Sequence, residues 1–443
     1  MANLKSKRDD TGGFAQTKLL GKMLRPFPCL VCVATLGFTF LAFKSIGHNQ
    51  IGILRNGSNI SVTFDAESGA TYRLERKLDL TNLTWLGIAG VNDFSATNNG
   101  PAAMTNSNAL AQARAFYRVK QTLPCDVALP SNSSDPINYA KAMELCETTT
   151  EQGSDPGIIS AQFTLASGTG TPDVRSRSIR PFFGLSNFPR AGVAMVVLST
   201  GAAAGKGQVN PTFVPFQNQG LNTGTASAPP ADWLALNGGT FPNSPGCSAG
   251  SSSVYNPVML TLRIRVPNNA QSFAVSAKFF SSDYPEYVCS QYNDRFVALL
   301  DSSFAGTPSN PADKNIATYT DPTAQKYPMS VNLAQAGLLT QCVNGATGCS
   351  GSLGNSGTMN SCTGTSGLTG TGMDDQAANL CDPNSVVGGG TDWLVLRGNV
   401  VPGEIITLRF AIWDTLDGFW DSLVLLDNFQ WSASTVTPGM FLQ

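Results

Sequence analysis

Apolar and polar residues alternate with a period of two through much of the C-terminal two thirds of the chain. In "PVMLTLRIRVP", residues 257–267, leucine, isoleucine and valine alternate with threonine and arginine. Stretches 273–279 and 406–412 repeat the pattern, and 191–199 is a short, continuous apolar run. A period of two places the apolar side chains on one face of a strand. We therefore predict an all-β fold, an antiparallel β-sandwich or jelly roll with long loops.

A shorter alternating pattern lies in residues 51–120, where Ile60, Val62 and Phe64 share one face. Four to six short strands of this kind predict a small β-sandwich module ahead of the larger domain. Between the two, residues 136–147 have helical spacing instead. The residues near one face of this predicted helix are Ile137, Ala140, Met143 and Cys146.

The N-terminus has the pattern of an export signal. Six lysines and arginines within the first 26 residues precede the uncharged, apolar stretch 28–43. A basic region followed by an apolar helix is typical of a signal peptide, so we assign residues 1–50 to this function. An uncleaved signal-anchor is the alternative, and only in that case would the protein touch a membrane. Both alternatives predict export of residues 50 onward.

Composition narrows the function. Only 13% of the 443 residues are charged, while Gly 44 and Pro 26 indicate many turns. The net charge of −2 gives no reason to expect a nucleic-acid partner. The single histidine, His48, precedes both predicted modules. Catalysis by Ser-His-Asp or Cys-His groups and His-ligated metal sites are therefore excluded from them.

Cysteine spacing indicates disulfides in an oxidising compartment. Cys29 and Cys32 lie in the apolar N-terminal stretch. Eight others follow residue 120: Cys125, Cys146, Cys247, Cys289, Cys342, Cys349, Cys362 and Cys381. The simplest of the 105 possible connectivities pairs them in sequence order, 125 with 146, 247 with 289, 342 with 349 and 362 with 381.

Residues 51–120 resemble the small fibronectin-like repeats of exported bacterial proteins. The matching features are Gly69, Tyr72, Trp85 and the "FYRV" of residues 116–119. The resemblance implies an accessory, spacer-like module.

Residues 121–435 resemble the choice-of-anchor family, in the L-type, disulfide-rich form of myxobacterial surface proteins. The strongest stretches are "FFSSDYPEYVCSQYNDRFVALLD" and "IITLRFAIWDTLDGFWDSLVLLDNFQW". The resemblance implies an exported β-sandwich on the bacterial cell surface, without an established enzymatic activity. Residues 436–443 are left as a short tail.

Acidic residues gather in two stretches, and three interpretations of them stay open. They can cap turns, as Asp-Gly pairs do. They can bind Ca²⁺, which takes six to eight oxygen ligands. They can act as the carboxylate pair of a glycosidase. The candidate Ca²⁺ ligands are Asp283, Asp294, Asp414, Asp417, Asp421, Asp427 and Asn428.

Aromatic residues in the same stretches are candidates for stacking on a sugar: Tyr284, Tyr287, Phe419 and Trp420. Taken together, the sequence predicts a secreted or cell-surface bacterial protein that acts by binding, adhesion or structure and not by catalysis. Its predicted partners are a glycan, another surface protein or a second copy of itself. A Ca²⁺-dependent carbohydrate-binding module and a carboxylate glycosidase are the alternatives.

Overall fold

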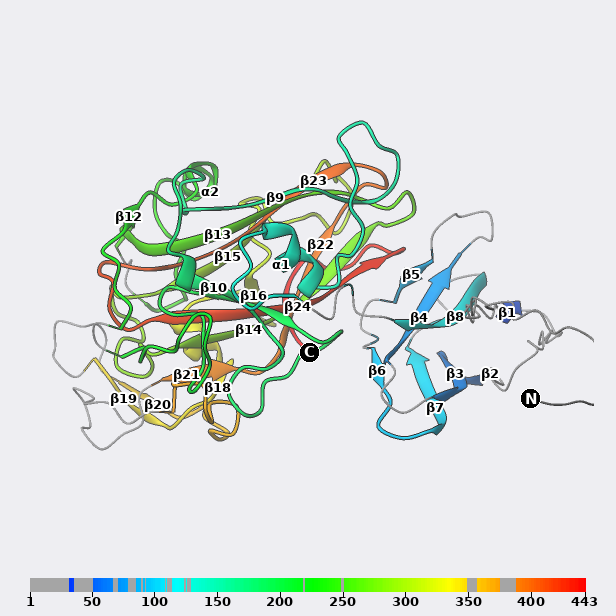
Figure 1. The fold of residues 1–443 in the computed structure, drawn as a ribbon, viewed down its shortest axis with the longest axis horizontal. Coiled ribbons are helices and arrows are strands. Elements are labelled where there is room, and N and C mark those ends of the chain that lie inside the picture. The colour runs from blue at the N-terminus through cyan, green and yellow to red at the C-terminus, as the bar shows by residue number, and fades with distance from the viewer. Residues whose placement is uncertain are drawn as a thin grey trace, which may run out of the picture.

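The computed structural model confirms the predicted all-β class. Strands dominate the chain, helices are few and short, and the sheets are mostly antiparallel. Figure 1 shows a small N-terminal module beside a larger β-sandwich. The structure describes residues 32–35, 51–66, 71–78, 85–88, 91, 93–107, 109, 114–122, 125, 129–217, 220–247, 251–348, 357–374 and 388–443.

Two antiparallel sheets form the N-terminal module, and their apolar faces enclose a core that includes Val62, Leu74 and Tyr117. One sheet contains β2 (Gly52–Asn56), β3 (Asn59–Ala66) and β7 (Gly100–Asn106). The other contains β1 (Cys32–Thr35), β8 (Arg114–Thr122), β4 (Thr71–Lys77), β5 (Leu86–Gly87) and β6 (Phe94–Ser95).

Strand β1 differs from the helix predicted for the apolar N-terminal stretch. Within residues 28–43 the structure describes only Cys32–Thr35, and these pair antiparallel with β8. The edge of β8 offers unpaired backbone groups, and β-branched Val33 and Thr35 favour an extended chain over a helix. A helical signal segment is therefore wrong for these four residues.

The larger domain stacks a ten-stranded sheet on a five-stranded one. The ten-stranded sheet contains β10 (Arg177–Arg180), β11 (Met195–Ser199), β24 (Ser422–Ser432), β14 (Ser272–Ser281), β22 (Leu394–Asn399), β25 (Gly439–Leu442), β16 (Thr318–Thr320), β17 (Lys326–Pro328), β18 (Leu339–Gln341) and β21 (Gly389–Thr391). The five-stranded sheet contains β12 (Ala226–Ser227), β13 (Val254–Arg265), β23 (Ile405–Asp414), β15 (Arg295–Asp301) and β9 (Gly157–Thr164). A separate hairpin joins β19 (Gly345–Thr347) to β20 (Gly357–Met359).

The predicted alternation is visible in β13. Leu260, Leu262 and Ile264 are buried in the core between the sheets. Arg263 points the other way and its guanidinium bonds the Glu151 carboxylate at 2.6 Å. Strand β25 comes from the segment predicted as a short tail, so that prediction is wrong. Apolar Met440 and Phe441 pair there with β22, which extends the sheet.

At one end of the sandwich, two loops carry the chain from one sheet to the other, and both contribute to the candidate site. Strand β14 ends in the large sheet and the chain continues into β15 of the small sheet; β23 then leads back to β24 of the large sheet. The loop containing Asp417-Gly418 is therefore a passage between sheets, not a hairpin turn within one. Because β24 runs toward the N-terminal module, this end is the one farther from it (Figure 1).

The helices are short, and one confirms a prediction. Helix α1 (Pro136–Ala142) begins at Asp135, whose side chain accepts the Ile137 N–H. The others are α2 (Ala231–Leu236) and the 3-10 helices η2 (Val174–Ser176) and η3 (Val331–Ala336). No helix in the described part of the chain is both long and apolar enough to span a membrane.

Three disulfides are described, and two match the predicted pairs: Cys125 with Cys146 and Cys247 with Cys289. The third joins Cys342 to Cys362, so sequence-order pairing is wrong there. Backbone bonds from β18 to the segment near Gly364 bring these two cysteines together. Cys349 and Cys381 lie outside the described residues. Disulfides of this number are typical of proteins from an oxidising, extracytoplasmic compartment.

Candidate functional site: a buried carboxylate cluster

Four aspartates meet where the chain crosses between the sheets. Asp283 follows β14 and Asp294 precedes β15, whereas Asp414 ends β23 and Asp421 precedes β24. Their exposed fractions are 2%, 2%, 0% and 0% respectively. Four members of the predicted Ca²⁺ set thus come together, although 138 positions separate the first from the last. We call these four residues the carboxylate cluster.

Asp294 joins the two crossings. The Thr415 N–H donates to its Oδ1 at 3.0 Å and the Ser422 hydroxyl donates to its Oδ2 at 2.8 Å. The carboxyl groups of Asp283 and Asp414 lie within hydrogen-bonding reach of it. One side chain therefore holds both ends of the β23–β24 passage against the start of β15.

The other three aspartates are poorly satisfied. Asp414 accepts one bond from the Asn256 amide at 3.0 Å through Oδ2, but its Oδ1 has no hydrogen-bond partner. The same is true of Asp283 Oδ2 and of both oxygens of Asp421. The Leu221 N–H and the Thr200 hydroxyl approach Asp421 and oppose the rise of its pKa, without reaching hydrogen-bond geometry. Four buried carboxylate oxygens are thus left without a donor among the described residues.

Burial and mutual repulsion shift these groups strongly. Burial raises the pKa of Asp294 to about 7, against the bonds from Ser422 and Thr415. Burial, followed by repulsion from Asp294, raises the pKa values of Asp283, Asp414 and Asp421 well above their usual range. At neutral pH the cluster must therefore hold protons or be neutralised by a cation.

No lysine or arginine within the described ranges forms an ion pair with the cluster. Arg295 is the neighbouring charge, and attraction to Asp294 partly offsets the effect of burial on its pKa. Its guanidinium, however, lies over the Phe241 ring and donates to the Pro242 carbonyl. The lysines and arginines of the described ranges therefore leave the carboxylates without a paired positive charge.

The remaining predicted ligands have other hydrogen-bond partners, although the charge of Asp417 still acts on Asp283. Asp417 is half-buried and its Oδ1 accepts the Phe419 N–H at 3.1 Å, as expected of a turn-capping aspartate. Asp427 lies six residues along β24 from Asp421, about 20 Å at the usual rise of a strand. Its carboxylate accepts the N–H groups of Arg190, Ala191 and Asn428. Asp427 and Asn428 belong to a bulge in the pairing of β24 with β14 and not to the cluster.

The predicted stacking residues do not form a flat platform. Tyr284 is fully buried, with its hydroxyl 3.0 Å from the Cys362 sulfur, so it is wrong as a ligand-stacking residue. Tyr287 is 8% exposed and packs on the Trp420 ring at 5.7 Å with an interplanar angle of 56°. Phe419 and Trp420 are half-buried. Since these rings are tilted relative to each other, they pack along the loop and do not present one flat face to a sugar.

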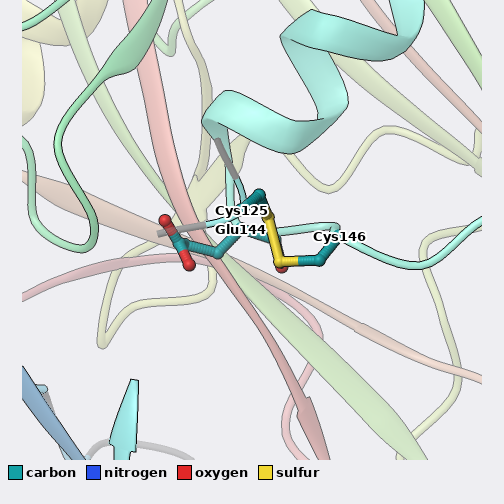
Figure 2. A group of neighbouring side chains, drawn as sticks. All are labelled: Cys125, Glu144 and Cys146. Atoms are coloured by element: carbon teal, nitrogen blue, oxygen red, sulfur yellow. A yellow bond between two sulfur atoms is a disulfide. The ribbon is translucent and has the colours of Figure 1, made fainter. Parts of the chain in front are cut away.

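Cys125, Cys146 and Glu144 are the one set of three potential metal ligands in the described ranges whose ligand atoms all lie within 4.8 Å of one another. Figure 2 shows why they do not form a metal site: the two sulfur atoms are bonded to each other. A disulfide supplies no thiolate ligand. Burial raises the pKa of Glu144 to about 7, against attraction to Arg73 of the N-terminal module.

A cleft of about 250 Å³ lies between the N-terminal module and the sandwich. Its walls include Trp85 and Lys120 on one side and Glu144 and Trp431 on the other. The Trp85 ring is covered by Lys77 and Arg118, at 5.1 and 4.9 Å. Trp431 is the second indole that lines this cleft, and its ring packs edge-to-face against Phe429 and Phe273, at centroid distances of 4.9 and 6.0 Å.

Sequence reasoning missed the neutral residues around the cluster. Thr200, Asn256 and Ser422 come from three different strands or their ends, and no spacing in the sequence links them to the aspartates. Gly201 and Gly220 were also missed. Both positions need glycine, because a Cβ on either would collide with the Asp421 carboxylate. Only the folded chain places these residues together.

Comparisons with known proteins leave the family open. No family model matches the chain, and no curated protein matches it. One solved structure with some similarity carries the description "Structural basis for the promiscuous specificity of the carbohydrate- binding modules from the beta-sandwich super family". It aligns over 88% of this chain and 100% of its own, with 8% identity and a TM-score of 0.18. A similarity at this level supports no argument about function.

Proposed function

We propose that this chain is an exported bacterial surface or matrix protein that acts by binding or as structure, without catalysis. The observation that carries the proposal is the closure of the carboxylate cluster. A glycosidase needs two carboxylates on either side of a sugar, separated by about 5 to 9.5 Å. Asp283, Asp294, Asp414 and Asp421 are at most 2% exposed, so a sugar cannot reach between them.

The disulfides and the resemblance to choice-of-anchor surface proteins support export. Cys125–Cys146 fixes the start of the larger domain, and Cys247–Cys289 ties a long, polar insert to the segment that carries Asp283 and Asp294. Such cross-links persist where thiols are oxidised. Long loops restrained in this way suit a protein exposed outside the cytoplasm.

The cleft between the modules favours carbohydrate as the ligand of such a binding protein. Apolar faces of sugar rings stack on indole rings, and charged side chains bond sugar hydroxyls. Trp431 supplies a partly buried indole, and Arg73, Lys120 and Glu144 supply the polar groups. Arg76 of the N-terminal module also bonds Ser434 at 2.7 Å, which helps to hold the two walls together.

The test is a glycan array with the wild-type protein, W431A and W393A, combined with a reducing-sugar assay. Trp393 is also partly buried but does not line the cleft, so W393A controls for loss of an indole. We expect glycan binding by wild type and W393A, at least tenfold weaker binding by W431A, and no released sugar. Hydrolysis that disappears in D294N would contradict the non-catalytic proposal.

If no glycan binds, sedimentation of the full chain and of a variant lacking residues 51–120 tests the adhesive or structural alternative. Self-association that is lost with the module would assign assembly to it, because its sheet edges can accept a further strand. A monomer that binds neither glycan nor itself would contradict both forms of the proposal.

A further inference from the structure

We infer that the carboxylate cluster is a buried site for one hard divalent cation, with Ca²⁺ as the preferred ion. The ligands would be Asp283, Asp294, Asp414 and Asp421. This inference concerns the stability of the sandwich and does not depend on which ligand, if any, the cleft binds.

Charge is the first argument. Four buried carboxylates lie around the same two passages between the sheets, and no lysine or arginine in the described part of the chain pairs with them. Burying several like charges without a counter-ion is very costly. A divalent cation would neutralise two of them, and protons retained on the others would balance the rest.

Unsatisfied oxygens are the second, independent argument. Clustering alone does not distinguish ligands from structural aspartates, but hydrogen bonding does. Among the described residues, Asp421 has no donor to either oxygen, and Asp283 and Asp414 each have one oxygen without a donor. These side chains are 98% or more buried, so bulk water does not satisfy them. Carboxylate oxygens that lack hydrogen-bond donors are suited to coordinate a metal ion instead.

The neighbouring neutral groups fit a hard cation. The Thr200 hydroxyl lies near both Asp414 and Asp421. Asn256 turns its Nδ2 toward Asp414 and its Oδ1 toward Thr223, so it supports Asp414 and is not itself a ligand. Carboxylate oxygens are the ligands that Ca²⁺ prefers. No three of the four carboxylates bring oxygens within 4.8 Å of one another, so the ion would draw them closer than they lie now. The adaptable coordination of Ca²⁺ suits this arrangement better than the strict octahedron of Mg²⁺.

Two crossings between the sheets would then be locked by one ion. Asp283 and Asp294 bracket the β14–β15 passage, and Asp414 and Asp421 bracket the β23–β24 passage. The Asp421 carbonyl already accepts the Ser282 hydroxyl at 2.8 Å, which holds the two passages side by side. The cation would complete this junction at the end of the sandwich farther from the N-terminal module.

Terbium luminescence and thermal unfolding of the full chain test the site. Tb³⁺ replaces Ca²⁺ and is excited through nearby indole rings, and Trp420 directly precedes Asp421. After EDTA treatment at pH 7.5, we expect sensitised emission that millimolar Ca²⁺ removes. We also expect Ca²⁺ to raise Tm by about 5 °C at concentrations well above Kd.

Asp421→Asn distinguishes a ligand from a purely structural aspartate. The neutral amide removes repulsion, so we expect D421N to melt at or above the wild type without Ca²⁺ but to lose at least 80% of the Ca²⁺ shift. D427N is the matched control, because Asp427 is equally buried and lies on the strand that Asp421 precedes; its Ca²⁺ shift should stay within 20% of wild type. If D421N does not fold, D414N replaces it.

The inference is overturned if wild-type Tm and Tb³⁺ emission do not respond to the ions. It is also overturned if D421N keeps the full Ca²⁺ shift, or if D427N loses as much of it as D421N. Equal shifts with Mg²⁺ and Ca²⁺ at the same concentration would overturn the preference for calcium. Glycan binding is measured separately, so failure of the metal site and failure of the proposed function give different results.

Discussion

Asp421 directly precedes β24 and Asp427 lies within it. Their comparison shows that two equally buried aspartates can differ in their hydrogen-bond partners. Both are fully buried, and burial raises both pKa values well above the usual range. Asp427 accepts three backbone N–H groups, whereas no residue that the structure describes donates to either oxygen of Asp421. The Asp427 carboxylate satisfies backbone donors, whereas the Asp421 carboxylate remains available to bind a cation.

Removing the Cys247–Cys289 disulfide should lower the free energy of unfolding more than any of the aspartate substitutions. It should also disturb the carboxylate cluster that contains Asp421. The bridge closes a separation of 42 residues, so its loss should cost about 4 kcal/mol of unfolding free energy. Cys289 lies between Asp283 and Asp294, so we expect C247S/C289S also to weaken the Ca²⁺ response. Urea unfolding with and without Ca²⁺ measures both. A double variant with an unchanged Ca²⁺ response would show that this bridge does not order the cluster.

Asp427→Ala should cost about 3 kcal/mol, because the N–H groups of Arg190 and Ala191 would lose their buried acceptor. This loss should be the same in Ca²⁺ and in EDTA. Denaturant unfolding under both conditions provides the measurement. D321A is a suitable control, since Asp321 caps an exposed turn with the same kinds of bonds. A cost for D427A that appears only with Ca²⁺ would place Asp427 in the metal site after all.

The cation-free protein should lose several degrees of Tm between pH 5.5 and pH 8.5. The folded-state pKa of Asp294, raised by burial to about 7, lies above its unfolded value. The protonated group therefore contributes its full stability at low pH, and this contribution disappears as pH rises through about 7. Calorimetry in EDTA should show the fall, and saturating Ca²⁺ should abolish most of it. A Tm that rises over this range in EDTA would contradict the account.

The smallest effect is expected at Asp232, a carboxylate with abundant partners. Its bond from Arg409, supported by Lys314, holds its pKa well below the usual range. The pair is only partly buried, so D232N should cost at most about 1 kcal/mol. The pH dependence has the opposite sign to that of the cluster, because a depressed pKa loses its stabilisation as pH falls. Acid titration of Tm for wild type and D232N tests this contrast.

Local pattern was enough to predict the strands. The alternation in residues 257–267 and 406–412 predicts β13 and β23, and the spacing after Pro136 predicts α1. These predictions hold because a strand or helix buries the face that its own residues define. Sequence order also predicted two disulfides, with separations of 21 and 42 residues. It failed for Cys342–Cys362, whose separation is 20, so the length of the closed loop did not decide the outcome.

Long-range contacts were not predictable in the same way. The Asp417-Gly418 turn has the sequence of a hairpin, but β23 pairs with β13 and β15 in one sheet, and β24 pairs with β11 and β14 in the other. Residues 436–443 have too little pattern to indicate a strand, yet β22 offers them an open edge. In both cases the partner strand decides the outcome, and a local sequence carries no information about it.

The sequence by itself determined the chemical class of this protein: an all-β chain with disulfides, acidic residues gathered in two stretches and no histidine in its folded modules. It also supplied the list of aspartates from which any oxygen-ligated site must be built. Only the tertiary structure decided which of them meet. Asp283, Asp294, Asp414 and Asp421 converge because two passages between the sheets lie side by side, while Asp427, six residues beyond, is satisfied by the backbone. Hydrogen-bond partners are a property of the fold, and they separate a structural carboxylate from one that can hold an ion.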